Sequence, residues 1–346
     1  MSAADRKNAF PWINTVKSIG IYLVVLGHLW YESNLHIINQ LIYSFHMPLF
    51  FILSGYLYRY KESISNTEFI KQKFFRTALP AIIWYMITGP IYIWSNRDKS
   101  IGKIILKFLF VDGDVPFNDP CWFFLVLFMV FVIVRLIRID KNSTMTNSVI
   151  ILSAFIIGGL LYYFKIPDYF GWVKTIISLG FFMIGYVSRN SARITSLSEV
   201  KITRIIVIPI SMILWIVFGA VLNEKVSFYG MILGNYWCFI LSGITGTLFL
   251  YSLIRAVYMH KGKFFSAIEK YPVKASVFII CSHYVPLKVY SAVCKKMDLF
   301  YTWKYNVITP FFALILIILY YPFYIFVSKH LSILNGEKKS ESRKLS

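Results

Sequence analysis

The chain has 346 residues, of which 58% are hydrophobic and only 15% are charged, whereas soluble domains carry about 25% charged residues. This composition excludes an ordinary soluble protein and predicts an all-α polytopic membrane protein. The formal net charge of +20 suits anionic partners such as membrane lipids, and we expect no nucleic acid among the partners. The four cysteines form no close pair, and no metal-ligand spacing is present, so we predict no metal site.

Ten hydrophobic segments are candidates for transmembrane helices. In chain order they cover residues 12–30, 37–58, 77–95, 121–138, 148–164, 171–188, 205–222, 230–253, 273–292 and 304–327. With the N-terminus in the cytoplasm, the inner segments hold 24 Lys and Arg and the outer segments hold 11. We therefore predict that both termini are cytoplasmic. We expect residues 1–330 to form one transmembrane domain and residues 331–346 to form a polar cytoplasmic tail.

The first segment, WINTVKSIGIYLVVLGHLW, contains two residues that interrupt its apolar pattern. Lys17 and His28 lie eleven residues apart, so both project from one helix face, separated by a rise of about 16 Å. All sixteen Asp and Glu lie outside the ten segments, so Lys17 has no carboxylate partner in hydrocarbon. Such intramembrane cations usually mark a substrate path. The alternatives are a Lys17 side chain that snorkels to the surface and a His28 side chain that is only packed.

The second segment contains FHMPLFFILSGYLY, in which His46 is the polar residue of interest. A short connection makes the first two helices antiparallel neighbours, and His46 is expected about 10 Å deeper than His28. The two histidines could therefore line one cavity without touching each other. Ser54 and Gly55 end this helix, where a small residue admits either a ligand or a neighbouring helix.

The stretch KQKFFRTALP precedes the third segment on the predicted cytoplasmic side. Lys73 and Arg76 lie one turn apart in this stretch, and basic residues so placed can bind phosphates. The alternative is that they serve only as a positively charged flank of the membrane helix.

On the predicted outer side, Glu32 follows the first helix, and Asp119 and Trp122 begin the fourth helix in NDPCWFF. Carboxylates there could orient an imidazole or bind sugar hydroxyls, or they could only solvate a loop. His283, in FIICSHYVPL, lies midway along the ninth helix, and Pro286 should kink that helix. Imidazole titrates near neutrality, so the intramembrane histidines are suited to take a proton from a hydroxyl group.

Together these motifs resemble the integral-membrane acyltransferase 3 family, in particular its sugar O-acetyltransferases of the fucose O-acetylase kind. The stretch WINTVKSIGIYLVVLGH is similar to the family's motif of a basic residue, ten spacers and a histidine. The other matching stretches are FHMPLFFILSGYLY, KFFRTALP, PCWFFLVLF and SVFIICSHYVP. Lys17 and Lys73 stand where many members have Arg, and Asn14 replaces a common Asp. Lysine keeps the charge but loses the bidentate fork of arginine.

The resemblance implies an O-acetyltransferase in a bacterial inner membrane, with acetyl-CoA as cytosolic donor and no permanently bound cofactor. The acceptor would be a lipid-linked glycan of the O-antigen or capsule type. We expect phosphate binding by Lys73 and Arg76 beside Ser54 and Gly55, and His28 as general base. The other expected catalytic residues are Lys17, His46 and His283, and the acceptor contacts are Glu32, Asp119 and Trp122.

Several alternatives fit the same sequence. Transfer could be direct or pass through an acetyl-histidine, and the acyl group could be acetyl or succinyl. The acceptor could instead be peptidoglycan or a small secreted metabolite. A transporter or flippase without catalytic activity would also explain a polar lining and a basic face, although no internal repeat is visible. The sequence does not predict an oligomeric state.

Overall fold

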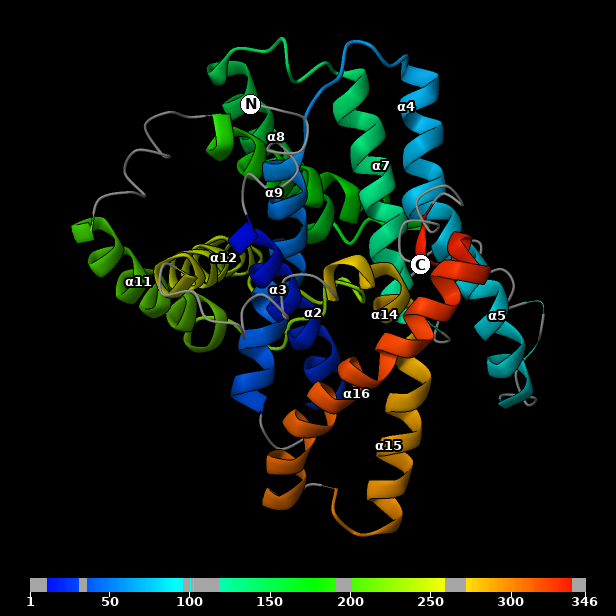
Figure 1. The fold of residues 1–346 in the computed structure, drawn as a ribbon. Helices are drawn as coiled ribbons and strands as arrows, with labels where there is room; N and C mark the ends of the chain where they lie inside the picture. Colours follow the sequence, from blue (N-terminus) through cyan, green and yellow to red (C-terminus); the bar gives the residue numbers. More distant parts are fainter. Residues whose placement is uncertain are drawn as a thin grey trace.

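The computed structural model describes residues 11–30, 36–95, 100, 102, 118–190, 201–258, 272–300 and 302–337 (Figure 1). We call the end of the bundle where α2 begins and α3 ends the Lys17 end, and the opposite end the His28 end. The long helices are α2 (Pro11–Trp30), α3 (His36–Leu57), α5 (Leu79–Ser95), α7 (Trp122–Leu136), α8 (Thr144–Tyr163), α9 (Trp172–Asn190), α11 (Lys201–Ile216), α12 (Tyr236–Tyr258), α15 (Tyr284–Lys296) and α16 (Trp303–His330). Shorter elements are α4 (Asn66–Lys73), α14 (Ser276–Ser282), the π-helical turns η1 (Phe74–Ala78) and η4 (Val217–Val221), and the 3₁₀ turns η2 (Asp119–Cys121), η3 (Tyr169–Gly171) and η5 (Ser332–Asn335).

Within the described residues, eight helices are long and apolar enough to cross a membrane. α14 and α15 together make a ninth span, bent by 44° at the break between them. The remaining predicted segment forms a shorter apolar helix over Ile205–Val221. The described part of the chain contains no strand, only an isolated bridge between Ser227 and Ile232. The structure thus confirms an all-α polytopic membrane protein.

α3 lies in the middle of the bundle, where it packs against α9, α12 and α2 (Figure 1). Its closest contact is with α9, through a pair of glycines. A Cβ atom on Gly55 would lie 1.8 Å from the carbonyl oxygen of Phe182, and one on Gly185 would lie 1.9 Å from that of Ile52. The two backbones therefore touch directly, which is how small residues stabilise helix pairs in membranes.

Pro48 interrupts the hydrogen bonding of α3 and at the same time fixes its position against α12. Proline has no N–H, so the carbonyl of Ser44, four residues earlier, loses its helical donor. The hydroxyl of Ser242 in α12 donates to this carbonyl at 3.3 Å. Gly243 leaves room for the proline ring, because a Cβ atom there would lie 2.8 Å from it. These contacts hold the part of α3 that carries His46.

Residues 223–235 form a loop, which corrects the prediction that the eighth helix starts at residue 230. α12 begins only at Tyr236. The side chain of Asn223 closes the loop, because its Oδ1 accepts a hydrogen bond from the backbone N–H of Asn235 at 2.7 Å. Leu233, which the prediction placed in that helix, is instead buried by the turn with 0% exposure, and Phe228 earlier in the loop is 2% exposed. The loop therefore reaches the interior of the His28 end.

Buried basic residues anchor the helix ends. Arg135 in α7 is 1% exposed, and its guanidinium donates to Asn66 Oδ1 at 2.8 Å and to Lys61 O at 3.1 Å. These bonds tie the connection between α3 and α4 to α7 at the Lys17 end. Near the start of α9, Lys174 forms a buried ion pair with Asp168. Each cation is thus satisfied, as burial of a charge requires.

The beginning of the predicted polar tail packs against the bundle. η5 follows α16, and its Asn335 is 4% exposed. The Asn335 side chain accepts from the backbone N–H of Phe278 at 3.2 Å and donates to Lys274 O at 3.1 Å. Trp84 Nε1 of α5 donates to Leu334 O at 3.1 Å. η5 therefore connects the end of α16 to α5 and α14.

Candidate active site

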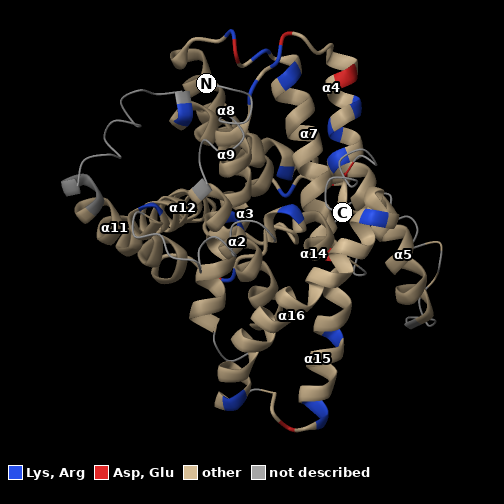
Figure 2. Ribbon diagram, in the orientation of Figure 1, with Lys and Arg blue, Asp and Glu red and all other residues tan. Residues whose placement is uncertain are grey.

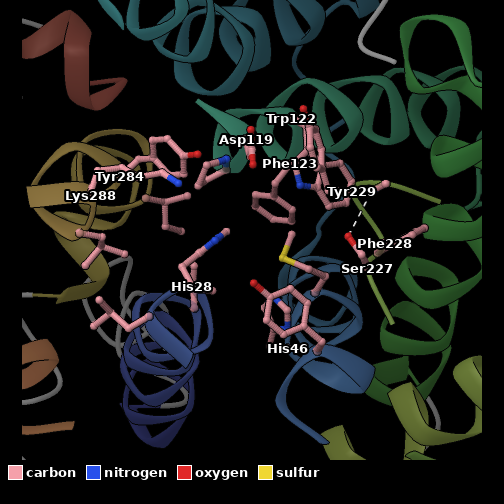
Figure 3. A pocket seen from close by; sticks show the side chains of 18 of the residues that line it. His28, His46, Asp119, Trp122, Phe123, Ser227, Phe228, Tyr229, Tyr284 and Lys288 are labelled. Atoms are coloured by element: carbon pink, nitrogen blue, oxygen red, sulfur yellow. Dashed lines mark hydrogen bonds between the residues drawn. The ribbon is translucent and has the colours of Figure 1, made fainter. Parts of the chain in front are cut away.

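A cavity of about 570 Å³ lies at the His28 end (Figure 3). Its wall is formed by α2, α3, η2, the start of α7, the end of α14, α15 and the loop 223–235. A volume of this size is typical of small-molecule sites. Most of the wall is aromatic or aliphatic. Its polar side chains are those of His28, Tyr43, His46, Asp119, Ser227, Tyr229, Tyr284, Lys288, Ser291 and Lys295.

His28 projects from the last turns of α2 into the cavity and is half-buried (Figure 3). Its ring centroid lies 5.3 Å from that of His283 and 6.2 Å from that of Tyr43. Among the described residues, none forms a hydrogen bond with His28, so both of its ring nitrogens are available to a ligand. The end of α2 is held by α16, because the Tyr305 hydroxyl donates to Leu29 O at 2.7 Å.

The other two intramembrane histidines each have one ring nitrogen committed to the backbone. His46 Nδ1 lies 2.8 Å from Ile42 O, and His283 Nδ1 lies 2.9 Å from Ile279 O. Because a carbonyl oxygen only accepts, each Nδ1 carries the hydrogen and each Nε2 of the neutral ring presents a lone pair. His46 lines the cavity, whereas His283 is fully buried beside His28 and its Nε2 has no partner in the described protein.

The break between α14 and α15 determines where His283 lies. Pro286 leaves the carbonyl four residues earlier without a donor, and the two helices meet at 44°, so the kink expected here is present. Asn118 Nδ2 donates to Cys281 O at 2.8 Å and so links α14 to the start of α7. The residue after Asn118 is Asp119. This hydrogen bond therefore holds Asp119 and the end of α14, where His283 follows, at fixed positions relative to each other.

Two of the three predicted acceptor contacts line the same cavity. Asp119 and Trp122 lie across the cavity from His28 (Figure 3). The Asp119 carboxylate accepts a hydrogen bond from the Tyr229 side chain. Its Oδ1 is buried and has no partner in the described protein, so it can accept from a ligand hydroxyl. Glu32, the third predicted contact, lies outside the described residues.

At the Lys17 end, Lys73 and Arg76 lie at the junction of α4 and α5. The π-helical turn η1 makes this junction, and such turns are frequent at functional sites. The Lys73 ammonium lies 3.7 Å from the ring centroid of Phe131, so this side chain points into the protein. Arg76 is exposed. The predicted phosphate-binding pair thus has one half-buried and one exposed member.

Lys17 is half-buried in α2 and is one of several cations that act electrostatically on Lys73. Lys17, Lys61 and Arg76 all repel the ammonium of Lys73. The residues that the structure describes give Lys17 neither a hydrogen bond nor an ion pair. A group of cations within the protein is unfavourable without a counter-charge, so this group is suited to an anionic ligand.

Ser54 and Gly55 differ in their surroundings. Ser54 is half-buried. Gly55 is covered by the backbone of Phe182, which leaves no room there for a ligand. For Gly55 the structure therefore shows the helix contact, which was the alternative to donor binding.

Aromatic side chains separate the cavity from the basic residues. Neither Lys17 nor Lys73 lines the cavity, and the α2 residue that lines it closest to the Lys17 end is Val24. Seven residues separate Val24 from Lys17, a rise of about 10 Å. Phe50 is the α3 residue of the wall nearest the Lys17 end, and its ring centroid lies 5.8 Å from that of Phe123, which lines the cavity beside it. Gly20 of α2 accommodates the Phe50 ring, because a Cβ atom there would lie 2.9 Å from Phe50 Cζ.

Sequence reasoning missed several polar residues of the cavity. Tyr229 lies in the loop 223–235, just before the predicted eighth segment, and its place in the wall depends on how that loop packs, so it could not be predicted. Lys288 and Lys295 were counted only as outer charges, but both line the cavity. Lys288 lies inside the predicted segment 273–292, so the criterion that singled out Lys17 would also have found it.

Within the described residues, no three of His, Cys, Asp and Glu are grouped so that they could hold a metal ion.

Comparison with known proteins gives one match. A family model described as an acyltransferase domain matches residues 10–330, nearly the whole chain. No curated protein and no solved structure matches the chain.

Proposed function

We propose, from the premise that this chain belongs to the acyltransferase 3 family and is a membrane acyltransferase, that it is an O-acetyltransferase of cell-surface glycans. Acetyl-CoA would be the donor, and the acceptor would be a sugar hydroxyl of an O-antigen or capsule precursor. The protein would lie in the bacterial inner membrane with its Lys17 end in the cytoplasm. The excess of 24 over 11 Lys and Arg on that side supports this orientation.

One observation carries the proposal most strongly. Among His28, His46 and His283, the intramembrane histidines, only His28 both lines the cavity and has two uncommitted nitrogens, within the part of the chain that the structure describes. A general base must be within hydrogen-bonding reach of its proton, so an uncommitted nitrogen facing a cavity is the required geometry.

The reaction would be a direct acyl transfer. His28 takes the proton of the acceptor hydroxyl while its oxygen forms a bond to the acetyl carbon. The carbon–sulfur bond breaks, and the proton passes from His28 to the leaving thiolate of coenzyme A. The buried Nε2 of His283, beside His28, can accept a hydrogen bond from the imidazolium and so stabilise it. Asp119 would orient the sugar through its unpartnered Oδ1.

The donor would approach from the Lys17 end. The phosphates of coenzyme A cannot enter hydrocarbon, so the nucleotide would stay with Lys73, Arg76 and Lys17. The pantetheine arm then has to cover the rise of about 16 Å from Lys17 to His28. It has to pass Phe50 and Phe123, which line the cavity on the side toward the Lys17 end. Movement of these two side chains would therefore accompany donor entry.

The test uses purified protein in proteoliposomes with acetyl-CoA supplied on one face at a time. Alkyl glycosides serve as acceptor mimics, and mass spectrometry detects an added acetyl group. We expect transfer only when acetyl-CoA is on the side of the Lys17 end, identified by labelling of a cysteine placed at the exposed Lys71. Transport of the glycoside without acetylation would establish the transporter instead. Equal rates from both faces would contradict the proposed donor path, and acetylation of peptidoglycan fragments alone would identify the rival acceptor.

A further inference from the structure

α15 carries two faces of opposite character. Six of its residues line the cavity, spaced by three or four residues as one helix face requires: Tyr284, Leu287, Lys288, Ser291, Ala292 and Lys295. On the other side, Val285, Val289 and Val293 are 44%, 59% and 48% exposed, as expected for contact with lipid. The polar face of a membrane helix that is turned toward a cavity normally belongs to a substrate path.

The cavity face of α15 brings two cations to the wall. Lys288 and Lys295 are seven residues apart, about 10 Å along the helix, and Ser291 lies between them. Lys288 lies beside the Tyr284 ring, 5.1 Å from its centroid, and acts electrostatically on His28 (Figure 3). Lys295 lies toward the end of α15, over the ring of Phe300 at 4.7 Å. The pair thus extends from near the reacting centre toward the helix end.

An internal partner does not account for Lys288. Asp119 is the acidic residue of the cavity wall and attracts Lys288, but in the described structure the two form no ion pair. The wall residues that the structure describes therefore give the Lys288 ammonium no ion-pair partner. Lys288 is exposed and lies on the cavity wall eight residues, about 12 Å, before the end of α15, so it is not one of the charges at that helix end.

The location of these lysines is unusual for a membrane protein. In the proposed orientation they lie on the outer side, where the positive-inside rule disfavours Lys and Arg. Figure 2 shows Lys and Arg along α15 and at the start of α16, far from those beside α4 and α7. Lysines that line a cavity on the disfavoured side indicate a role in binding.

We infer that Lys288 and Lys295 bind an anionic group of the acceptor, so that the acceptor of this enzyme is an acidic glycan lipid. The anion is a carboxylate of the sugar or the phosphate of the lipid carrier, which present the same chemistry to a lysine. Ser291 adds a hydroxyl donor between the two cations. This inference rests on the proposed function only in naming the ligand as the acceptor.

Equilibrium binding tests the inference without acetyl-CoA, so its result does not depend on catalysis. The protein is placed in nanodiscs of phosphatidylcholine, and calorimetry gives the Kd for two pairs of probes. Octyl glucuronide against octyl glucoside reports a sugar carboxylate, and farnesyl diphosphate against farnesol reports a carrier phosphate. We expect the charged member of at least one pair to bind about tenfold or more tightly. The preferred pair identifies the source of the anion.

Variants then locate the binding site. Lys288→Gln should abolish the preference for the charged probe, and Lys295→Gln should reduce it. Lys288→Arg keeps the charge and should retain the preference, which separates loss of charge from misfolding. Lys296→Gln is the matched control, because Lys296 is exposed on the same helix but does not line the cavity. Equal binding of charged and neutral probes, or an equal loss in the Lys296 variant, would overturn the inference even if acetyl transfer is observed.

Discussion

The two ends of the bundle are built differently. At the His28 end, a cavity of about 570 Å³ is already formed, and helices from both halves of the chain contribute to it together with the loop 223–235. At the Lys17 end, the basic residues lie outside this cavity, and Lys73 rests on the ring of Phe131. The difference is that a cavity is already formed at one end, whereas the basic residues at the other end lie outside it, with Phe50 and Phe123 on the cavity wall. Four substitutions separate the roles of the two ends.

The largest effect is expected at the His28 end. His28→Ala should lower acetyl transfer by about 10²–10⁴-fold, the usual contribution of a general base, with the protein inserted at normal levels. His46→Ala and His283→Ala should cost less, because their Nδ1 atoms are committed to Ile42 and Ile279. Initial rates in proteoliposomes give the comparison. A His28 variant that retains more than a tenth of wild-type activity would move the role of base to His46 or His283.

Lys17→Ala comes next, at the opposite end of the same helix. Lys17 has no partner among the described residues, so its charge is available for the donor phosphates. Removal of one charge-assisted contact should lower kcat/KM about tenfold or more, and Lys17→Arg should restore most of it. The measurement is kcat/KM for acetyl-CoA in the two variants. Full activity of the alanine variant would instead support a lysine that only snorkels.

The double variant Lys73→Ala/Arg76→Ala tests whether the two ends serve different substrates. It should raise the KM for acetyl-CoA about tenfold and leave the KM for the acceptor unchanged, because these side chains lie far from the cavity. The control is Lys71→Ala/Lys141→Ala, which removes the same charge from two exposed positions at that end. An increase confined to the acceptor KM would exclude separate entry of the two substrates.

The features of the molecule that could be predicted are those that depend on local sequence. The helices could be predicted because continuous apolar segments are a local property of the sequence. The kink near Pro286 was predictable for the same reason, since proline removes a specific hydrogen bond. Histidines in apolar segments indicated the site, and the structure places His28, His46 and His283 at one end of the bundle.

Features that depend on packing between distant segments could not be predicted. Residues 230–235 were placed in the predicted eighth helix, and only the tertiary contacts of the loop 223–235 show that α12 begins at Tyr236. Gly55 was equally compatible with a ligand or a helix, and the carbonyl of Phe182 decides between them. The position of Phe50 opposite Gly20 was likewise invisible in the sequence, although it places the Phe50 ring on the cavity wall toward the Lys17 end.

The smallest effect is expected from a substitution of Phe50, which lies on the cavity wall toward the basic residues. Phe50 is 7% exposed and lines the cavity on the side toward the Lys17 end. Phe50→Leu should therefore leave a gap in this wall without removing a catalytic group. Water can then enter along the donor path, and we expect a few-fold rise in acetyl-CoA hydrolysis without acceptor, relative to acetyl transfer. The matched control is Phe51→Leu, because Phe51 is fully buried in the adjacent position but does not line the cavity. Both variants lose the same volume, so equal hydrolysis in the two would attribute the effect to loosened packing rather than to an opened path. A rise confined to the Phe50 variant would show that this ring keeps the donor end separate from the acceptor end until acetyl-CoA enters.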